Sequence, residues 1–255
     1  MTAAVLALWG REVRVFLRDR ARVVGVLAQP VLFWVVFGFG FADSVSIAGS
    51  DAGYLQYLLP GMVALTVLFT AIYATLSVVE DRQSGVLQAV LVSPQPRGAV
   101  VLGVVLGGST LAVGQAALIA LLAPFVGLAP GVGGALVALL SCALLAVTFC
   151  ALGFVMAWRL KTTRAYHAIM NVLLVPVWLL SGAFFPEAGA SGAIAAVMRL
   201  NPATYGVGLL RYGLHGLPEA IPGSDLSLGV CLAVSAVVAV LALALAAAQA
   251  RRPES

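Results

Sequence analysis

Residues 98–158 read GAVVLGVVLGGSTLAVGQAALIALLAPFVGLAPGVGGALVALLSCALLAVTFCALGFVMAW and contain no Asp, Glu, Lys, Arg or His. As one straight helix these 61 residues would be about 90 Å long, whereas the hydrocarbon core of a bilayer is about 30 Å thick. The run must therefore fold back. Residues that end helices gather near its middle: Pro124, Gly127, Pro130, Gly131, Gly133 and Gly134. We predict two membrane-spanning helices, 99–123 and 133–157, joined by a short hairpin.

The rest of the chain has the same character. Of its 255 residues, 62% are hydrophobic and 9% are charged, and the mean hydropathy is +1.08. A soluble domain has about 45–50% apolar and about 25% charged residues, so a soluble enzyme, a disordered regulator and a nucleic-acid-binding module are excluded. Four more charge-free runs of about 20 residues or more predict spans at 23–42, 54–79, 166–185 and 226–249. The expected fold is all-α, with six transmembrane helices.

The basic residues predict the orientation of the chain in the membrane. The net charge is +4, and 12 of the 14 Lys and Arg fall before the first span, between spans two and three, between spans four and five, or in the tail 250–255. The other two, Arg199 and Arg211, precede the last span and are expected at the outer interface. Basic loops remain on the cytoplasmic side, so both termini are expected there.

Residues 1–22 are expected to form a cytoplasmic amphipathic helix. Leu6, Trp9 and Val13 recur at steps of three and four residues. A second face carries basic side chains at the same rhythm, namely Arg11, Arg14 and Arg18. This pattern is typical of a helix lying at the membrane interface. It serves either as a simple anchor to anionic lipid or as a surface on which a cytoplasmic partner docks.

Two connections outside the predicted spans carry short helical segments. Residues 80–97 read EDRQSGVLQAVLVSPQPR, a short helix-compatible stretch between acidic residues and prolines. It is either an ordinary surface loop or a rigid helix that transmits a push. In the connection 187–225, Asn201-Pro202 separates two short apolar segments, because the residue before a proline avoids the helical region. Both segments are too short to span, so they re-enter the membrane or lie on its outer leaflet.

The chain lacks the residues that catalysis, metal binding or ion coupling would require. Its one lysine, Lys161, does not follow a glycine-rich loop, so a Walker A motif is absent. His167 and His215 have no metal-ligand spacing, and the tetrad 189–192, GASG, has no histidine at a plausible distance for serine-protease chemistry. No ionisable residue is predicted deep within a span, which argues against a proton- or sodium-driven transporter.

Three stretches of the chain resemble a known family, the ATP-binding-cassette type 2 export permeases, and particularly its drug-resistance and nodulation-factor exporter branch. The first is Leu59-Pro60-Gly61-Met62, and the second runs from Asp81-Arg82-Gln83-Ser84-Gly85 to Pro96-Arg97. The third begins at Leu180-Ser181-Gly182 and Phe185-Pro186 and continues through Asn201-Pro202-Ala203-Thr204-Tyr205 to Leu210-Arg211. Their order and the six-span layout cover essentially the whole chain.

The resemblance implies the permease subunit of an ATP-driven exporter in a bacterial inner membrane. Two copies of this chain would pair with two copies of a separate ATP-binding subunit, which would hold ATP and Mg²⁺, and this chain would bind no cofactor. A sister permease in place of the second copy remains an alternative, and no nucleic acid is expected as a partner. The ATPase-coupling residues implied by the resemblance are Arg11, Arg14, Arg18, Glu80, Asp81, Arg82, Gly85, Pro94 and Arg97.

The substrate is left open by the sequence. Spans with few charges suit an amphipathic or lipid-like molecule, such as a drug or secondary metabolite. Side chains that would line its path are Phe33, Phe37, Phe69, Tyr73, Asn171 and Trp178, although the aromatic ones equally suit packing or contact with lipid. Export of a polysaccharide or glycolipid is an alternative function, and so is a membrane assembly factor that transports no small molecule.

Overall fold

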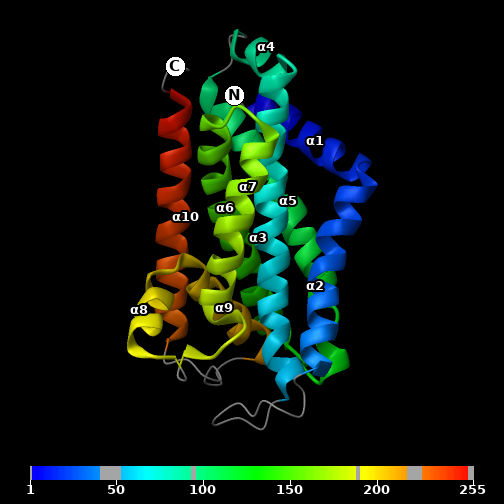
Figure 1. Cartoon of the computed structure of the whole chain (residues 1–255), viewed down its shortest axis with the longest axis vertical. Helices are drawn as coiled ribbons and strands as arrows, with labels where there is room; N and C mark the ends of the chain where they lie inside the picture. Colours follow the sequence, from blue (N-terminus) through cyan, green and yellow to red (C-terminus); the bar gives the residue numbers. More distant parts are fainter. Residues whose placement is uncertain (1, 41–52, 93–95, 188–189, 217–225, 252–255) are drawn as a thin grey trace.

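The computed structural model describes residues 2–40, 53–92, 96–187, 190–216 and 226–251. Within these ranges the chain is entirely helical and has no strand. Its elements are α1 Thr2–Arg18, α2 Arg20–Gly40, α3 Tyr54–Gln83, α4 Val86–Val92, α5 Arg97–Ala120, the 3-10 turn η1 Ala123–Val126, α6 Val132–Arg159, α7 Thr163–Trp178, the π-helical turn η2 Leu179–Ala183, α8 Gly192–Leu200, α9 Pro202–His215 and α10 Leu228–Arg251. Figure 1 shows them as one elongated bundle.

Six of these segments are long and apolar enough to cross a membrane: α2, α3, α5 with η1, α6, α7 with η2, and α10. The predicted all-α fold with six membrane spans is confirmed. The fold-back expected within 98–158 is also present, because α5 and α6 are separate helices joined through η1 and residues 127–131. The apolar run is thereby divided into two helices, each of which satisfies its own backbone hydrogen bonds within the membrane.

Several helices extend past the predicted spans because the polar residues at their ends have partners. α3 continues from 79 to Gln83, where Asp81 and Arg82 contact neighbouring helices. α7 begins at Thr163 rather than 166, and the hydroxyl of Thr162 accepts a hydrogen bond from the Ala165 amide at 3.2 Å. In contrast, the helix predicted over residues 1–22 is shorter in the structure, where α1 ends at Arg18 and α2 begins at Arg20.

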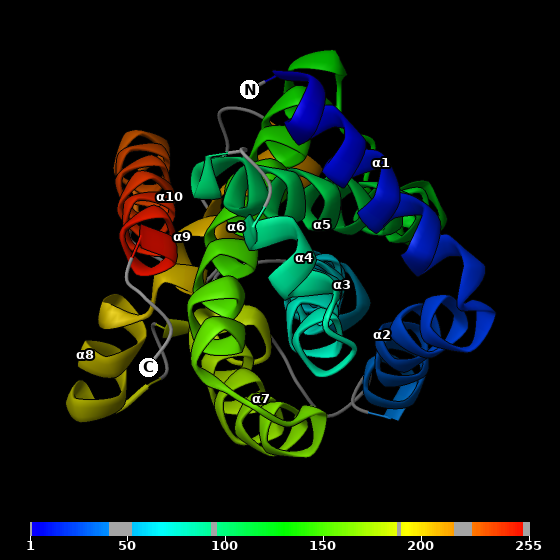
Figure 2. The ribbon, with the colours of Figure 1, turned by 90° about the horizontal axis from the view of Figure 1, so that it is seen from above.

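The centre of the bundle is α3. Figure 2 shows α2, α5, α6 and α7 arranged around it, and α9 packs against it as well. Nearly every residue from Tyr57 to Val79 is buried, as expected for a helix that is apolar on all sides. Small residues let neighbouring helices approach it closely: a Cβ added at Gly153 of α6 would lie 2.5 Å from the Thr75 hydroxyl.

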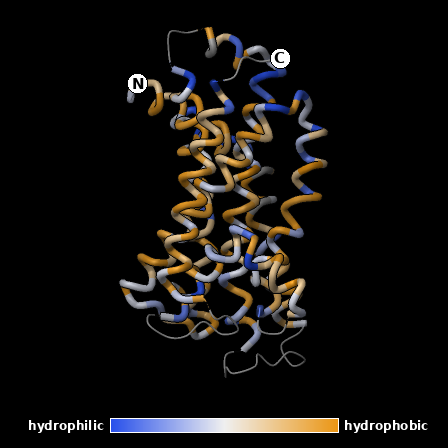
Figure 3. The backbone as a smooth tube through the Cα atoms, turned by 90° about the vertical axis from the view of Figure 1, so that its left-hand side faces the viewer, coloured by the Kyte–Doolittle hydropathy of each residue, from blue (hydrophilic) through white to orange (hydrophobic). Residues whose placement is uncertain are grey.

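The two ends of the bundle differ in composition. α1, α4, the last turn of α10 and both ends of the chain lie at one end, whereas α8 and α9 lie toward the other (Figure 1). Hydrophobic residues follow the middle of the helices, and hydrophilic residues gather mainly near the ends (Figure 3). We name the end that carries α1 and α4 the basic end, after Arg11, Arg82, Arg97 and Arg159.

The two short helices predicted before the last span are present as α8 and α9. They are separated at Asn201, as the Asn-Pro pair predicts. The Asn201 side chain accepts from the Ala203 amide at 3.0 Å and donates to the Val177 carbonyl at 2.6 Å. This residue therefore caps α9 and also joins it to α7.

Candidate functional site

A bidentate ion pair joins α1 to α3 at the basic end. Arg11 Nη1 donates to Asp81 Oδ2 at 2.7 Å, and Nη2 donates to the other carboxylate oxygen. The hydrogen bonds with Asp81 raise the pKa of Arg11 above its ordinary value. Two parallel bonds hold the guanidinium in one plane with the carboxylate, so the pair restricts orientation as well as distance.

α1 is also packed across α5. Trp9 Nε1 donates to the Thr110 hydroxyl at 3.0 Å. A Cβ added at Gly107 would lie 2.7 Å from Glu12 Cβ, so the glycine admits α1 at close range. The Glu12 side chain is only 5% exposed, and this burial raises the pKa of its carboxyl. α1 is therefore fixed to two spans, through an ion pair to α3 and through close packing to α5.

Arg82 binds the carboxyl end of α6. Its guanidinium donates to three backbone carbonyls, those of Trp158 at 2.8 Å, Leu160 at 2.8 Å and Ala157 at 3.3 Å. Its Cζ also lies 5.8 Å from the centre of the Trp158 ring. The last carbonyls of a helix lack partners within the helix and carry partial negative charge, so an arginine stabilises them. Arg82 thus ties the end of α3 to the end of α6.

Gly85 lies at the joint between α3 and α4. Its φ of +78° is in the left-handed region that favours glycine, and it lets the chain turn sharply after Ser84. α4 then packs against α3 through Leu87, which is buried. The turn places a seven-residue helix at the basic end, directly after Asp81 and Arg82.

The other predicted coupling residues have separate positions. Arg97 Nη1 donates to the Ala250 carbonyl at 3.4 Å and so joins α5 to the end of α10. Arg14 is exposed and donates to the Gly10 carbonyl of its own helix at 2.9 Å. Arg18 is exposed in the last turn of α1, and Pro94 lies outside the described residues. Every predicted coupling residue that the structure describes lies at the basic end.

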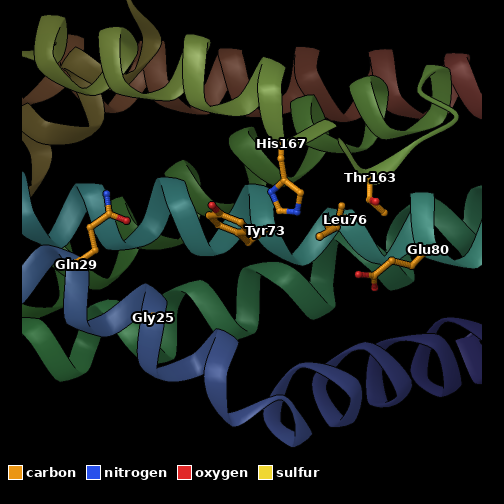
Figure 4. A pocket seen from close by; sticks show the side chains of 7 residues that line it. All are labelled: Gly25, Gln29, Tyr73, Leu76, Glu80, Thr163 and His167. Carbon is orange, nitrogen blue, oxygen red and sulfur yellow. The ribbon is translucent and has the colours of Figure 1, made fainter. Parts of the chain in front are cut away.

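A cavity of about 500 Å³ lies between α2, α3 and α7, near the basic end. This volume is within the range of about 300–1,000 Å³ of small-molecule sites. Figure 4 shows His167 projecting from α7 into the space between Tyr73 and Leu76. The cavity combines aromatic, apolar, polar and acidic side chains, and the residues that line it are Gly25, Gln29, Tyr73, Leu76, Glu80, Thr163 and His167.

The six predicted substrate-path residues do not form one group. Phe33, Phe37 and Trp178 meet around Phe184, with ring centres 4.9–6.3 Å apart. Phe69 stacks on Tyr73 at 6.2 Å, and only Tyr73 lines the cavity. Asn171 is exposed on α7.

Four residues that line the cavity were not among the predicted substrate-path residues, although the sequence contained a signal for them. They are Gln29, Glu80, Thr163 and His167. Each helix contributes at helical spacing: 25 and 29 on α2, 73, 76 and 80 on α3, and 163 and 167 on α7. Residues three or four apart share one face of a helix. Aligning these faces required knowledge of which helices are neighbours.

Toward the other end, Arg211 and Tyr57 share one carbonyl. Tyr57 Oη and Arg211 Nη2 both donate to the Gly182 carbonyl, at 3.0 and 2.5 Å. The guanidinium carbon lies 4.0 Å from the centre of the Tyr57 ring. Arg211 is only 3% exposed, because α9 turns this side chain into the bundle. Trp178 Nε1 donates to the Gly61 carbonyl at 2.9 Å. Together with the bond from Arg211 to Gly182, this contact brings the stretches at 59–62, 180–182 and 210–211 close to one another.

The six spans, the packed amphipathic α1 and the cavity between spans define a multi-pass membrane protein with features of a transport subunit. Residues 3–215 match the family model described as ABC-2 type transporter, so the chain belongs to this family. The chain is thus an ABC-2 permease component, and in this family the ATPase is a separate subunit.

The chain is similar to several curated proteins over most of its length. Nodulation protein J of Rhizobium meliloti (strain 1021) is 26% identical over 235 residues, which cover 90% of this chain and 88% of that protein. Daunorubicin resistance ABC transporter permease protein DrrB1 of Streptomyces coeruleorubidus is 26% identical over 222 residues, or 85% and 76% of the two chains. Putative transport permease ycf38 of Cyanophora paradoxa is 25% identical over 205 residues, or 78% and 71%.

Proposed function

We propose that the chain is the permease subunit of an exporter that moves an amphipathic or lipid-like molecule out of the cytoplasm or inner leaflet. The observation that carries this proposal is the cavity between α2, α3 and α7 near the basic end. Its mixed lining suits a molecule with both apolar and polar parts. The relative named for daunorubicin resistance supports a drug or secondary metabolite as the cargo.

In the proposed arrangement the basic end faces the cytoplasm of a bacterial cell. The excess of Lys and Arg at this end supports that orientation, in which both termini would lie inside. Two copies of the chain and two separate ATP-binding subunits form the transporter. The exposed face of α1 with Arg14 and Arg18, together with α4, meets the ATP-binding subunit.

The contacts of α3 suggest how a push on α4 reaches the spans. α4 joins α3 at Gly85, within four residues of Asp81 and Arg82. A displacement of this joint acts on α1 through Arg11 and on α6 through the carbonyls that Arg82 binds. It also acts on the cavity directly, because Glu80 lines it from the same turn of α3. Closure of the ATP-binding subunits would thus change the cavity through these contacts.

Export of a polysaccharide or glycolipid is less well supported. An aromatic mouth that stacks on sugar rings would favour it, and aromatic residues do gather at the end of α3 away from the basic end. Tyr54, Tyr57 and Trp178 are each at most 5% exposed, so their rings serve packing, and the exposed rings Phe39, Phe125 and Phe185 belong to three separate segments of the chain. The function as an assembly factor without transport is separated from export by the experiment below.

The test is purification from native membranes in mild detergent, followed by mass spectrometry and reconstitution. We expect an ATP-binding subunit with a Walker A motif to co-purify in equal ratio. In inside-out vesicles, the complex should take up the amphipathic dye Hoechst 33342 when ATP is added. A partner whose Walker A lysine is replaced by alanine is the matched control. If crosslinked membranes yield no ATP-binding subunit, export is overturned and the assembly-factor function takes its place.

A further inference from the structure

We propose that another cavity, between α3, α5, α6 and α9, holds the acyl chain of a lipid that enters sideways from the bilayer. This cavity has a volume of about 460 Å³ and lies beside the turn that joins α5 to α6, away from the basic end. We name it the hairpin cavity. It is lined by other residues than the cavity between α2, α3 and α7, and the proposal does not depend on which molecule is exported.

The lining of the hairpin cavity suits a hydrocarbon chain. Every described residue that lines it is apolar, and the most polar group among them is the thiol of Cys142. Six of these residues are alanines, whose small side chains leave space between the helices. A buried water needs about two to four polar partners, so walls of this kind favour an apolar occupant. A cavity of about 150 Å³ with apolar walls already holds benzene, and the hairpin cavity is about three times as large.

The hairpin cavity opens on an outward face of the bundle. Its rim includes Ala117 and Leu121 at the end of α5, and Ala135 and Leu139 of α6, and all four are exposed. These residues belong to two of the six membrane-spanning segments. An opening between two apolar spans is reached from the hydrocarbon of the bilayer, so its natural occupant is an acyl chain.

The packing around the hairpin cavity keeps it open. Beneath it α9 already touches α6, because a Cβ added at Gly213 would lie 2.6 Å from the Ala138 amide nitrogen. Beside it the turn between α5 and α6 is tied to α3, where Gln56 Nε2 donates to the Val126 carbonyl at 2.6 Å. Walls that are fixed in this way cannot move together to fill the space. Atoms that face an empty space lose contacts, so a chain that fills it stabilises the protein.

The experiment asks which residues a lipid chain reaches. The complex purified from native membranes is reconstituted in nanodiscs with a phosphatidylcholine that carries a diazirine near the end of one acyl chain. After irradiation, peptide mass spectrometry locates the label. We expect label on Cys142 and Val63, which line the cavity and are at most 4% exposed, so lipid at the outer surface of the bundle does not reach them. Label confined to exposed residues would overturn the proposal.

A pair of substitutions at the rim should block entry of the chain. Ala117→Phe with Ala135→Phe places a ring on each side of the opening and should lower the labelling of Cys142 and Val63 roughly tenfold. Leu118→Phe is the matched control, because Leu118 is exposed on the same helix and is not among the lining residues. Its labelling should stay within about twofold of wild type.

Unchanged labelling in the double variant would overturn the proposal. The wild-type result decides by itself if the double variant fails to fold.

Two further results would assign the hairpin cavity to a different occupant and overturn the proposal. If saturating Hoechst 33342 abolishes the labelling of Cys142, the cavity holds cargo in place of lipid. If Leu121→Cys, at the rim, yields a disulfide-linked pair of chains, a second copy covers the opening. Labelling of Cys142 that persists with the dye, together with a Leu121→Cys variant that stays unlinked, supports a lipid chain.

Discussion

Arg11 and Asp81 lie 70 residues apart in the sequence and form a bidentate ion pair between α1 and the end of α3. Each is predicted to couple the chain to the ATP-binding subunit, and in the structure they bind one another. The pair makes α1 and α3 move together at the end of the bundle where α4 begins. It therefore belongs to the connection between partner and spans in the proposed mechanism.

Removing either member of this pair should loosen α1 from α3. We expect Arg11→Ala and Asp81→Ala each to destabilise the protein, and the double variant to cost less than the sum, with a coupling of roughly 1–2 kcal/mol. Thermal unfolding of the four detergent-solubilised proteins measures this coupling. Arg14→Ala is the matched control, because Arg14 is exposed and binds only within its own helix in the contacts described above. Strictly additive losses would show that the pair contributes no coupling.

The same pair should matter for transport. Arg11→Ala should reduce ATP-driven dye uptake several-fold more than it reduces the amount of assembled complex, because a push on α4 no longer reaches α1. The exchanged pair, Arg11→Asp with Asp81→Arg, should restore part of the uptake. Uptake that falls only in proportion to assembly would mean that the pair has no role beyond stability.

The pH dependence of stability should carry the signature of Glu12. Burial raises the pKa of its carboxyl above the ordinary value of 4.5, so the folded protein favours the neutral form. The resulting stabilisation is fully present below pH 4.5 and is lost as the pH rises through the raised value. Relative to Glu12→Gln, the melting temperature of the wild type should fall as the pH rises from 4.5 through the raised pKa. A difference between the two proteins that does not change with pH would contradict the assignment.

Arg82→Ala should destabilise the protein by about 2–4 kcal/mol, because it leaves three carbonyls at the end of α6 without their donor. Arg82→Lys keeps the charge but loses the planar fork, and should recover only part of this stability. Arg159→Ala is the control: Arg159 is exposed and makes one long hydrogen bond, 3.3 Å to Gln249, so its loss should cost about 0.5 kcal/mol or less. Equal effects of Arg82→Ala and Arg159→Ala on thermal unfolding would contradict the role of Arg82 in stabilising the end of α6.

Gly61→Ala should be strongly destabilising. A Cβ at this position would lie 2.6 Å from the Ala183 carbonyl oxygen, so α3 and η2 would have to separate. The expected loss is about 2 kcal/mol or more, and melting temperature measures it. Gly114→Ala on α5 is the matched control: a Cβ there meets nothing within 4 Å, and the change should be neutral or stabilise by about 0.5–1 kcal/mol. Similar melting temperatures for the two variants would refute the close contact.

The sequence by itself determined the class of fold and the number of spans. A bilayer requires about 20 apolar residues per helix, and every backbone group must find its partner within the helix, so charge-free runs translate directly into spans. Local signals also predicted where helices end, because Pro and Gly interrupt a helix. The Pro and Gly cluster at 124–134 separates α5 from α6, and Asn201-Pro202 separates α8 from α9. The coupling candidates were implied by the resemblance to the family and not by these local signals.

Only the tertiary structure decided which side chains meet. α3 is apolar on nearly all sides, so its periodicity does not mark the face that contacts each neighbour. The pairing of Arg11 with Asp81 and the meeting of Arg211 with Tyr57 depend on how helices are rotated and shifted against each other. The cavity with Glu80 and His167 needs three helices in register. Packing between apolar surfaces in a membrane selects that register through shape, which hydropathy does not encode.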